Sequence, residues 1–226
     1  MSILENKINE LVREDIRLAS FFQNEKIDFC CNGHRLIGEV LKEKGVDKDA
    51  FLQKLETFQQ ALEKEGEKDD FFKDMDNEEL IGHIRVKHHL YTRGVLKDLD
   101  QYVSAIVKAH YRHDKSLLLE INRLYGSLRT ELLEHLIKEE VDLFPLIIES
   151  NFKDASAQIL ETEKEHDAAG NILQSLRIVT NEYTLPTWGC ETFRAVYHHL
   201  EALESDLFRH IFLENSVLFE RVLNTK

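Results

Sequence analysis

Apolar residues recur along most of the chain at the three- and four-residue spacing that places them on one face of a helix. No stretch sustains the alternation of apolar and polar residues that is typical of a strand. Only 2 prolines and 9 glycines interrupt the 226 residues, and Leu, Glu, Lys, Ile and Ala, which favour helices, are abundant. The pattern predicts an all-α protein.

Four long amphipathic segments follow one another after residue 76. They extend over about residues 77–110, 115–149, 153–182 and 187–223, and only a few residues separate each from the next. Short connections between long helices make those helices antiparallel neighbours. We therefore predict an up-down-up-down four-helix bundle over residues 77–226.

The first 62 residues predict a smaller helical domain. Helical spacing of apolar residues extends to Phe22, and further helices are expected over about residues 34–44 and 48–61. A unit of this size has a thin core, so we expect it to pack against a partner. The charged stretch 63–76 is typical of a solvated linker between two domains.

One pattern occurs twice in the predicted bundle. His135 and Glu139 stand four residues apart, as do His210 and Glu214, and Leu-Phe begins four residues after each Glu. Residues four apart lie on one helix face about one turn from each other, so each pair directs an imidazole and a carboxylate the same way. Each pair therefore offers two ligands for a metal ion.

Two further histidines occupy matching places in the other two helices. His135 and His210 are 75 residues apart, and His89 and His166 are 77 apart. Within each helix pair the separations are 46 residues, from His89 to His135, and 44 residues, from His166 to His210. One helix pair is thus used twice, and the repeat predicts a metal site made of His89, His135, Glu139, His166, His210 and Glu214.

The predicted ligands share helix faces with apolar residues. On the second bundle helix the predicted face consists of Ile121, Leu124, Leu128, Glu131, His135, Glu139 and Leu146; on the fourth it consists of Val196, Leu200, Leu203, Leu207, His210, Glu214 and Val217. A single histidine on an apolar face is more often an ordinary core residue. A lone carboxylate does not tolerate an apolar interior, however, so two carboxylates at one level indicate bound cations.

Four imidazoles and two carboxylates suit two iron ions. Each ion would receive two nitrogens and a share of both bridging carboxylates, with room for an oxo bridge or an external ligand. Zinc or manganese would fit the same donors. At about 1.5 Å per residue, His110 lies about 31 Å along the helix from His89, which excludes it from the same ion.

Two more carboxylates are candidates for a place near the metal. Glu131 precedes His135 by one turn and is expected to face inward with it, and Glu165 directly precedes His166. Both could accept hydrogen bonds from ligands or line an access route. For Glu165 an ordinary place on the helix surface is the alternative.

Two adjacent cysteines, Cys30 and Cys31, interrupt the helical pattern of the first domain. Adjacent cysteines pair with each other only through a strained ring. We expect a helix to follow them, and its dipole would favour their thiolate forms. The two thiols could bind a metal, take up nitric oxide or pass electrons; alternatively they are two small buried hydrophobes.

Charge and composition narrow the classes of partner. A formal charge of −13 argues against nucleic acid, because phosphate binding needs a basic surface. We find no signal segment and no apolar run of membrane-spanning length, and we therefore expect that the protein does not associate with a membrane. Three cysteines, two of them adjacent, make no disulfide framework, and we therefore expect a reducing cytoplasm.

The sequence from Asp28 to Gly33 resembles the double-cysteine signature of the RIC family (repair of iron centres; also called ScdA or YtfE proteins). Segments 131–140, 165–167 and 210–219 resemble the hemerythrin-like domain of that family, and both parts occur in the right order over nearly the whole chain. The resemblance favours His89 over His88 as the ligand. It also agrees with a double-cysteine domain at 1–62, a linker at 63–76 and a hemerythrin-like domain at 77–226.

The resemblance implies a non-haem di-iron protein that restores iron–sulfur clusters damaged by nitric oxide or oxidants, in the cytoplasm and often as a homodimer. Its partners would be proteins with damaged clusters, with nitric oxide or oxygen as the small ligand. Cys30 and Cys31 would handle iron or nitric oxide, and Glu131 and Glu165 would lie near the di-iron centre. Repair would proceed by iron donation or by reductase-like chemistry on nitric oxide. The alternative is a hemerythrin-like carrier or sensor of oxygen or nitric oxide, which has no need of the two cysteines.

Overall fold

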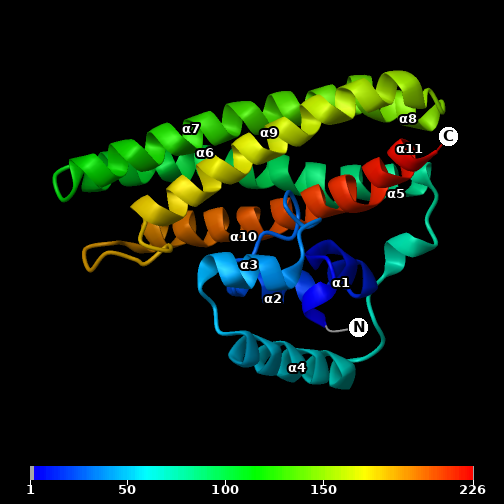
Figure 1. The fold of residues 1–226 in the computed structure, drawn as a ribbon. Helices are drawn as coiled ribbons and strands as arrows, with labels where there is room; N and C mark the ends of the chain where they lie inside the picture. Colours follow the sequence, from blue (N-terminus) through cyan, green and yellow to red (C-terminus); the bar gives the residue numbers. More distant parts are fainter. Residues whose placement is uncertain (1–2, 226) are drawn as a thin grey trace. The chain divides into compact units, whose positions relative to one another are not determined.

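The computed structural model describes residues 3–225, and within this range it consists of helices without a single strand (Figure 1). The predicted all-α class is therefore confirmed. The helices form two compact units: one extends from Asn77 to Leu207, and the other combines the chain up to Asp76 with the chain from Phe208 onward.

The unit of residues 77–207 is a bundle of four antiparallel helical rods. Its elements are α5 (Asn77–Ile84), the π-helical turn η3 (Arg85–His89), α6 (Leu90–His110), α7 (Lys115–Lys138), the π-helical turn η4 (Glu139–Leu143), α8 (Phe144–Ile148), α9 (Phe152–Val179) and α10 (Glu191–Leu213) up to Leu207. Figure 1 shows α6, α7, α9 and α10 running alongside one another. The predicted up-down-up-down bundle is confirmed.

Side chains close the ring of helices. Helix α7 packs between α6 and α9. Helix α10 meets α6 where the rings of Tyr102 and His199 lie 5.4 Å apart, and it meets α9 through an ion pair of 2.7 Å between Arg177 and Glu204. The side chain of Asp114 accepts a hydrogen bond from the backbone of Leu117 and so begins α7 after a short connection.

Three π-helical turns interrupt the rods, and each contains a predicted metal ligand. The turn η3 ends at His89, η4 begins at Glu139, and η5 (Glu214–Leu218) begins at Glu214. Such turns are frequent at functional sites because the extra residue re-aims the side chains around it. The four predicted helical segments are therefore present, and the π-helical turns within them are a feature that the sequence analysis did not predict.

The turn η4 also explains one error in the predicted apolar face of α7 and α8. Counting at 3.6 residues per turn from Glu139 predicts that Leu146 is buried. The wider π turn advances the register by one residue, so Ile147 is buried instead and Leu146 is half-exposed. The predicted face of α10 and η5, from Val196 to Val217, is buried at every position.

The second unit joins the beginning and the end of the chain. Its elements are η1 (Ile3–Glu5), α1 (Ile8–Glu14), α2 (Leu18–Asn24), α3 (Ile37–Lys44), α4 (Lys48–Glu65), η2 (Phe71–Lys73), the last residues of α10, η5 and α11 (Phe219–Asn224). Phe21, Phe22 and Phe51 form an aromatic core with ring centroids 5.4–6.5 Å apart. The ring of Phe29 lies 6.2 Å from that of Phe212, so the end of α10 adds to this thin core.

The charged stretch 63–76 is mostly exposed, but it is fastened at one point. Phe72 is buried, with its ring 6.2 Å from that of Phe212. The guanidinium of Arg221 donates hydrogen bonds of 2.8 Å to the carbonyls of Phe72 and Met75. The segment therefore has a defined path within its unit.

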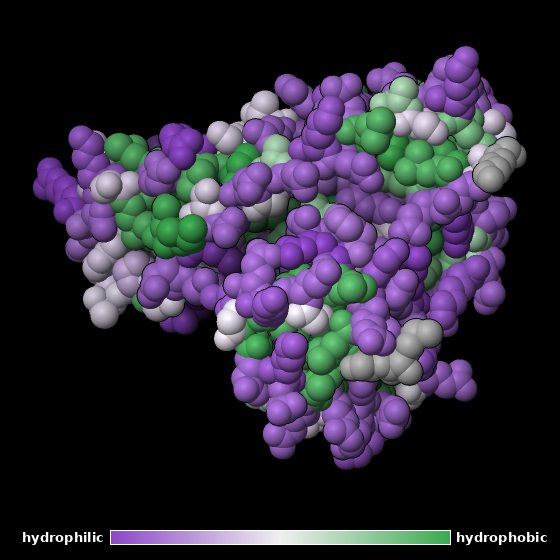
Figure 2. Space-filling view, in the orientation of Figure 1, coloured by the Kyte–Doolittle hydropathy of each residue, from purple (hydrophilic) through white to green (hydrophobic). Residues whose placement is uncertain are grey.

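The surface is predominantly hydrophilic and carries only smaller hydrophobic patches on the face that Figure 2 shows. This agrees with the excess of 42 acidic over 29 basic residues. No helix between residues 3 and 225 is both long enough and apolar enough to cross a membrane.

Candidate metal centre

Glu139 lies at the middle of a buried cluster in the bundle unit. Nε2 of His89 is 3.4 Å and Nε2 of His135 is 3.3 Å from Oε2 of Glu139. Nε2 of His166 is 3.9 Å from the other carboxylate oxygen, Oε1. Three imidazoles on three different helical rods thus face one carboxylate, and all four side chains are buried.

The donor set of this cluster fits a metal ion. His135, Glu139 and His166 each offer a ligand atom, and these atoms all lie within 4.8 Å of one another. The Nε2 atoms of His135 and His166 are only 3.2 Å apart, which directs two imidazole nitrogens at one point. Imidazole and carboxylate are ligands shared by iron, zinc and manganese. The cluster can therefore hold a metal ion.

Hydrogen bonds fix which nitrogen two of the imidazoles turn toward the cluster. Nδ1 of His89 lies 2.7 Å from Oε1 of Glu140, and Nδ1 of His135 lies 3.0 Å from Oε2 of Glu165. Because a carboxylate only accepts, each Nδ1 carries the proton and donates it. With the proton on Nδ1, it is Nε2, the nitrogen turned toward Glu139, that can offer a lone pair to a metal ion.

The two supporting carboxylates are each paired with a cation. Arg93 donates to Glu140 at 2.9 Å, and Lys138 donates to Glu165. The hydrogen bond from His135 is the main cause that lowers the pKa of Glu165 to about 2, and Lys138 adds to it against partial burial. Burial raises the pKa of Glu140, but hydrogen bonds from His89 and Arg93 outweigh it and leave that pKa below its ordinary value. Both carboxylates are ionised acceptors at neutral pH.

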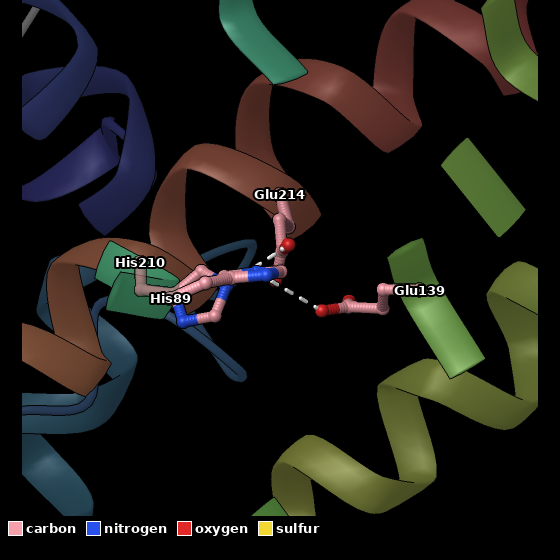
Figure 3. A group of neighbouring side chains, drawn as sticks. All are labelled: His89, Glu139, His210 and Glu214. Atoms are coloured by element: carbon pink, nitrogen blue, oxygen red, sulfur yellow. Dashed lines mark ion pairs between the residues drawn. The ribbon is translucent and has the colours of Figure 1, made fainter. Parts of the chain in front are cut away.

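His210 and Glu214 belong to the other unit, where α10 passes into η5. Nε2 of His210 lies 3.0 Å from Oε1 of Glu214, and both side chains are buried. The four-residue spacing thus places imidazole and carboxylate one turn apart, as the sequence predicts. Figure 3 shows this pair and the pair of His89 and Glu139, each joined by a dashed line.

Glu165 contacts a predicted ligand, His135, whereas Glu131 does not point into the bundle. Glu131 is exposed, so the inward orientation predicted for it is wrong. The buried line of α7 runs from Leu128 through Leu132 to His135, and Glu131 lies beside this line. His88 is buried but points elsewhere, with Nδ1 3.0 Å from Oδ1 of Asp206.

Sequence reasoning missed three residues that support the ligands: Arg93, Lys138 and Glu140. Each stands close in the sequence to a predicted ligand. Arg93 follows His89 by four residues, Lys138 follows His135 by three, and Glu140 directly follows Glu139. Their partners lie on a neighbouring helix, however, so no spacing within one helix could identify them.

The adjacent cysteines lie in a loop held by Asp28. Oδ1 of Asp28 accepts hydrogen bonds from the backbone N–H groups of Cys30, at 3.0 Å, and Cys31, at 2.9 Å. The two sulfur atoms are 3.8 Å apart, and Sγ of Cys30 is 3.4 Å from the same carboxylate oxygen. These three residues form a second group of potential metal ligands.

The prediction that a helix dipole favours the thiolates is wrong. The next helix, α3, begins only at Ile37, six positions after Cys31. The hydrogen bond with Cys31, burial, and the negative charge of Asp28 raise the pKa of Cys30 well above its ordinary value. Cys30 is therefore a protonated thiol at neutral pH unless a cation binds beside it.

The cysteine loop packs against the segment that carries His210 and Glu214, since both belong to one compact unit. Nδ2 of Asn215 donates a hydrogen bond of 3.4 Å to the carbonyl of Cys30. The ring of Phe29 lies 6.3 Å from that of Phe208. The thiols are therefore linked to the predicted ligands through neighbouring residues, since Asn215 follows Glu214 and Phe29 precedes Cys30.

Comparisons with known proteins cover both parts of the chain. Residues 80–222 match the hemerythrin HHE cation binding domain, and residues 4–59 match the ScdA N-terminal domain, a domain of unknown function (DUF542). A probable iron–sulfur cluster repair protein of Haemophilus influenzae is 31% identical over 100% of both chains. The iron–sulfur cluster repair protein ScdA of Staphylococcus haemolyticus is 31% identical over 96% of this chain and 97% of its own. The iron–sulfur cluster repair protein YtfE of Escherichia coli is 31% identical over 99% of both.

Proposed function

This chain belongs to the family of iron–sulfur cluster repair proteins with a hemerythrin HHE domain, and we propose that it restores damaged iron–sulfur clusters by means of a di-iron centre. The observation that carries the proposal is the buried cluster around Glu139, in which three imidazoles face one carboxylate. Bound iron would supply a labile metal ion and an open coordination position for nitric oxide or oxygen.

The proposed ligand set is the six-residue set that the repeat predicts. Two iron ions would share these six side chains, with two imidazoles for each ion and with Glu139 and Glu214 shared between them. Two observations support this assignment. Glu139 and Glu214 occupy the same position at the start of a π-helical turn, and each has a histidine one turn before it.

The residues behind the ligands would control how firmly iron is held. Glu140 and Glu165 hold the Nδ1 protons of His89 and His135, which keeps each Nε2 available to the metal. A ligand can release its metal when a proton takes the place of the ion on Nε2. Lys138 pairs with Glu165 near the protein surface and so holds in place the carboxylate that supports His135.

We assign Cys30 and Cys31 the handling of iron or electrons during repair. Asp28 and the two sulfur atoms offer three ligand atoms within 4.8 Å of one another, which suits a transient iron ion. All three cysteines of the chain are free thiols, and this favours a reducing cytoplasm as the compartment. The substrates would be proteins whose clusters nitric oxide or oxidants have damaged.

The proposal is tested by repair of a damaged client. Iron-loaded protein is incubated with an enzyme whose iron–sulfur cluster has been destroyed by nitric oxide, and the recovered enzyme activity is followed against an equal amount of iron salt. Recovery above the iron-salt control is expected, and it should fall to that control in the Cys30→Ala, Cys31→Ala double variant. Recovery no greater than with iron salt would refute the repair function and would leave a carrier or sensor of oxygen or nitric oxide.

A further inference from the structure

A histidine and a cysteine meet in the bundle unit far from the predicted ligands. Nε2 of His110, the last residue of α6, lies 3.1 Å from Sγ of Cys190, which directly precedes α10. His110 is 21 residues from His89 along the rod, about 31 Å at 1.5 Å per residue. The pair is therefore independent of the metal centre.

Aromatic rings enclose the imidazole of His110. Its ring centroid lies 5.5 Å from that of Trp188 and 5.8 Å from that of Phe193, while Trp188 stacks on His113 at 5.3 Å. His110 is only 9% exposed, and its Nδ1 has no hydrogen-bond partner within the described residues 3–225. A buried imidazole is thus held against one sulfur atom, which is the only hydrogen-bond partner found for its ring in that range.

Cys190 itself lies at the surface, at the start of α10. Cys190 is exposed, and its carbonyl accepts the hydrogen bond of Arg194 in the first turn of α10. The N-terminus of a helix stabilises negative charge that develops on a neighbouring atom.

We propose that Cys190 is a reactive thiol that forms mixed disulfides with small-molecule disulfides, with His110 as its proton acceptor. Sγ of Cys190 attacks one sulfur of the small molecule, a new S–S bond forms, and the S–S bond of the small molecule breaks. The thiol proton passes to Nε2 of His110 and then to the departing sulfur, which leaves as a free thiol. Cys190 is oxidised, and the departing half of the small molecule is reduced.

The surroundings of the three cysteines differ in a way that favours Cys190. Cys30 is buried, and its pKa is raised by Cys31, by burial and by Asp28. Cys190 is exposed and faces an imidazole instead of a carboxylate. A base beside a nucleophilic thiol is the arrangement that activates it.

The test follows the reaction of the full-length protein with dithiobis(nitrobenzoate), in a background where Cys30→Ser and Cys31→Ser leave Cys190 as the one thiol. The release of nitrothiobenzoate reports the rate, and mass spectrometry of the product locates the label. His110→Ala should slow the reaction about tenfold or more, since a positioned base contributes at least that much to proton transfer. The matched variant His113→Ala, which removes the other stacked histidine, should react nearly as the parent does.

Addition of free imidazole distinguishes proton transfer from a packing role. It should restore much of the rate in the His110→Ala variant and change the rate of the His113→Ala variant little. Circular dichroism shows whether each variant is folded, and if His110→Ala is not, the volume-conserving His110→Gln takes its place. The proposal is overturned if the His110 variant reacts as fast as the parent, or if Cys190 reacts no faster in the folded protein than in urea.

Discussion

The carboxylate of Glu165 stands behind His135, one of the proposed metal ligands. It accepts a hydrogen bond of 3.0 Å from Nδ1 of His135 and pairs with Lys138. Its negative charge raises the basicity of the imidazole and fixes its tautomer. The neighbouring Glu161, one turn earlier on α9, is exposed and serves as the matched comparison.

We predict that Glu165→Gln weakens iron binding about 10- to 100-fold, because the imidazole loses an ionised acceptor while the volume of the side chain is kept. Competition of the protein with a chelator for ferrous iron measures the change. Glu161→Gln should leave the affinity as it was. Equal affinities of the two variants would show that Glu165 is an ordinary surface carboxylate.

At this scale the sequence predicts residues that share a helix and misses residues that meet across helices. His135 with Glu139, and His210 with Glu214, follow from four-residue spacing alone. Glu140 supports His89 from another rod, 51 residues away, and no local pattern marks it. The predicted inward orientation of the Glu131 side chain is wrong because helical spacing does not decide whether a residue at the edge of an apolar face points into the core or toward solvent.

At the scale of elements, the periodicity of the sequence does not predict the π-helical turns. A repeat of 3.6 residues locates α7 and α10 and their buried faces, and it places the ends of the bundle helices close to where they are. The π-helical turn that begins at Glu139 leaves no mark in the composition or the apolar content of the segment. Its effect on the side chains is that Ile147 is buried in place of Leu146.

The cysteine loop depends on one glycine. A Cβ on Gly33 would lie 2.3 Å from the carbonyl oxygen of Phe29 and 2.9 Å from Cβ of Asn9. We predict that Gly33→Ala destabilises the protein by about 1–3 kcal/mol, because backbone has to move to make room. Gly126→Ala on α7, where a Cβ meets nothing within 4 Å, should stabilise by up to about 1 kcal/mol. Urea unfolding distinguishes them, and equal effects would contradict the crowded loop.

The junction of α1 and α2 rests on a buried carboxylate. Asp15 pairs with Arg17 at 2.6 Å and accepts backbone hydrogen bonds from Arg17 and Asp69. Burial alone would raise the pKa of Asp15, but these hydrogen bonds outweigh it and lower that pKa from its ordinary 3.8. A lowered pKa in the folded state means that the contribution to stability is present above pH 3.8 and is lost as the pH falls further.

We therefore predict that Asp15→Asn destabilises the protein by about 1.5–3 kcal/mol at neutral pH, as expected for hydrogen bonds to a charged group. The difference from the unsubstituted protein should shrink as the pH falls below 3.8. Urea unfolding at a series of pH values measures it, with the exposed Asp98→Asn as control. A difference that stays constant down to pH 3 would contradict the assignment.

At the scale of the whole molecule, contacts between the ends of the chain lie beyond what periodicity predicts. Nδ2 of Asn9 donates to Oγ of Ser216 across 207 residues, and Asn215 reaches the carbonyl of Cys30 across 185. A pattern within one helix shows that a face is apolar but not which distant segment covers it. Only the resemblance to a family links the double cysteine with the hemerythrin-like domain.

The iron content of protein loaded under anaerobic conditions tests the central claim most directly. Six ligands in two repeated sets predict about two iron ions per chain. The iron content should fall below one ion per chain in Glu139→Gln, because this change keeps the shape of the side chain but removes the charge that three histidines face. The control is His198→Gln at an exposed histidine, and its iron content should be unchanged. A protein that binds no iron, or that binds as much after Glu139→Gln as before, would contradict the account.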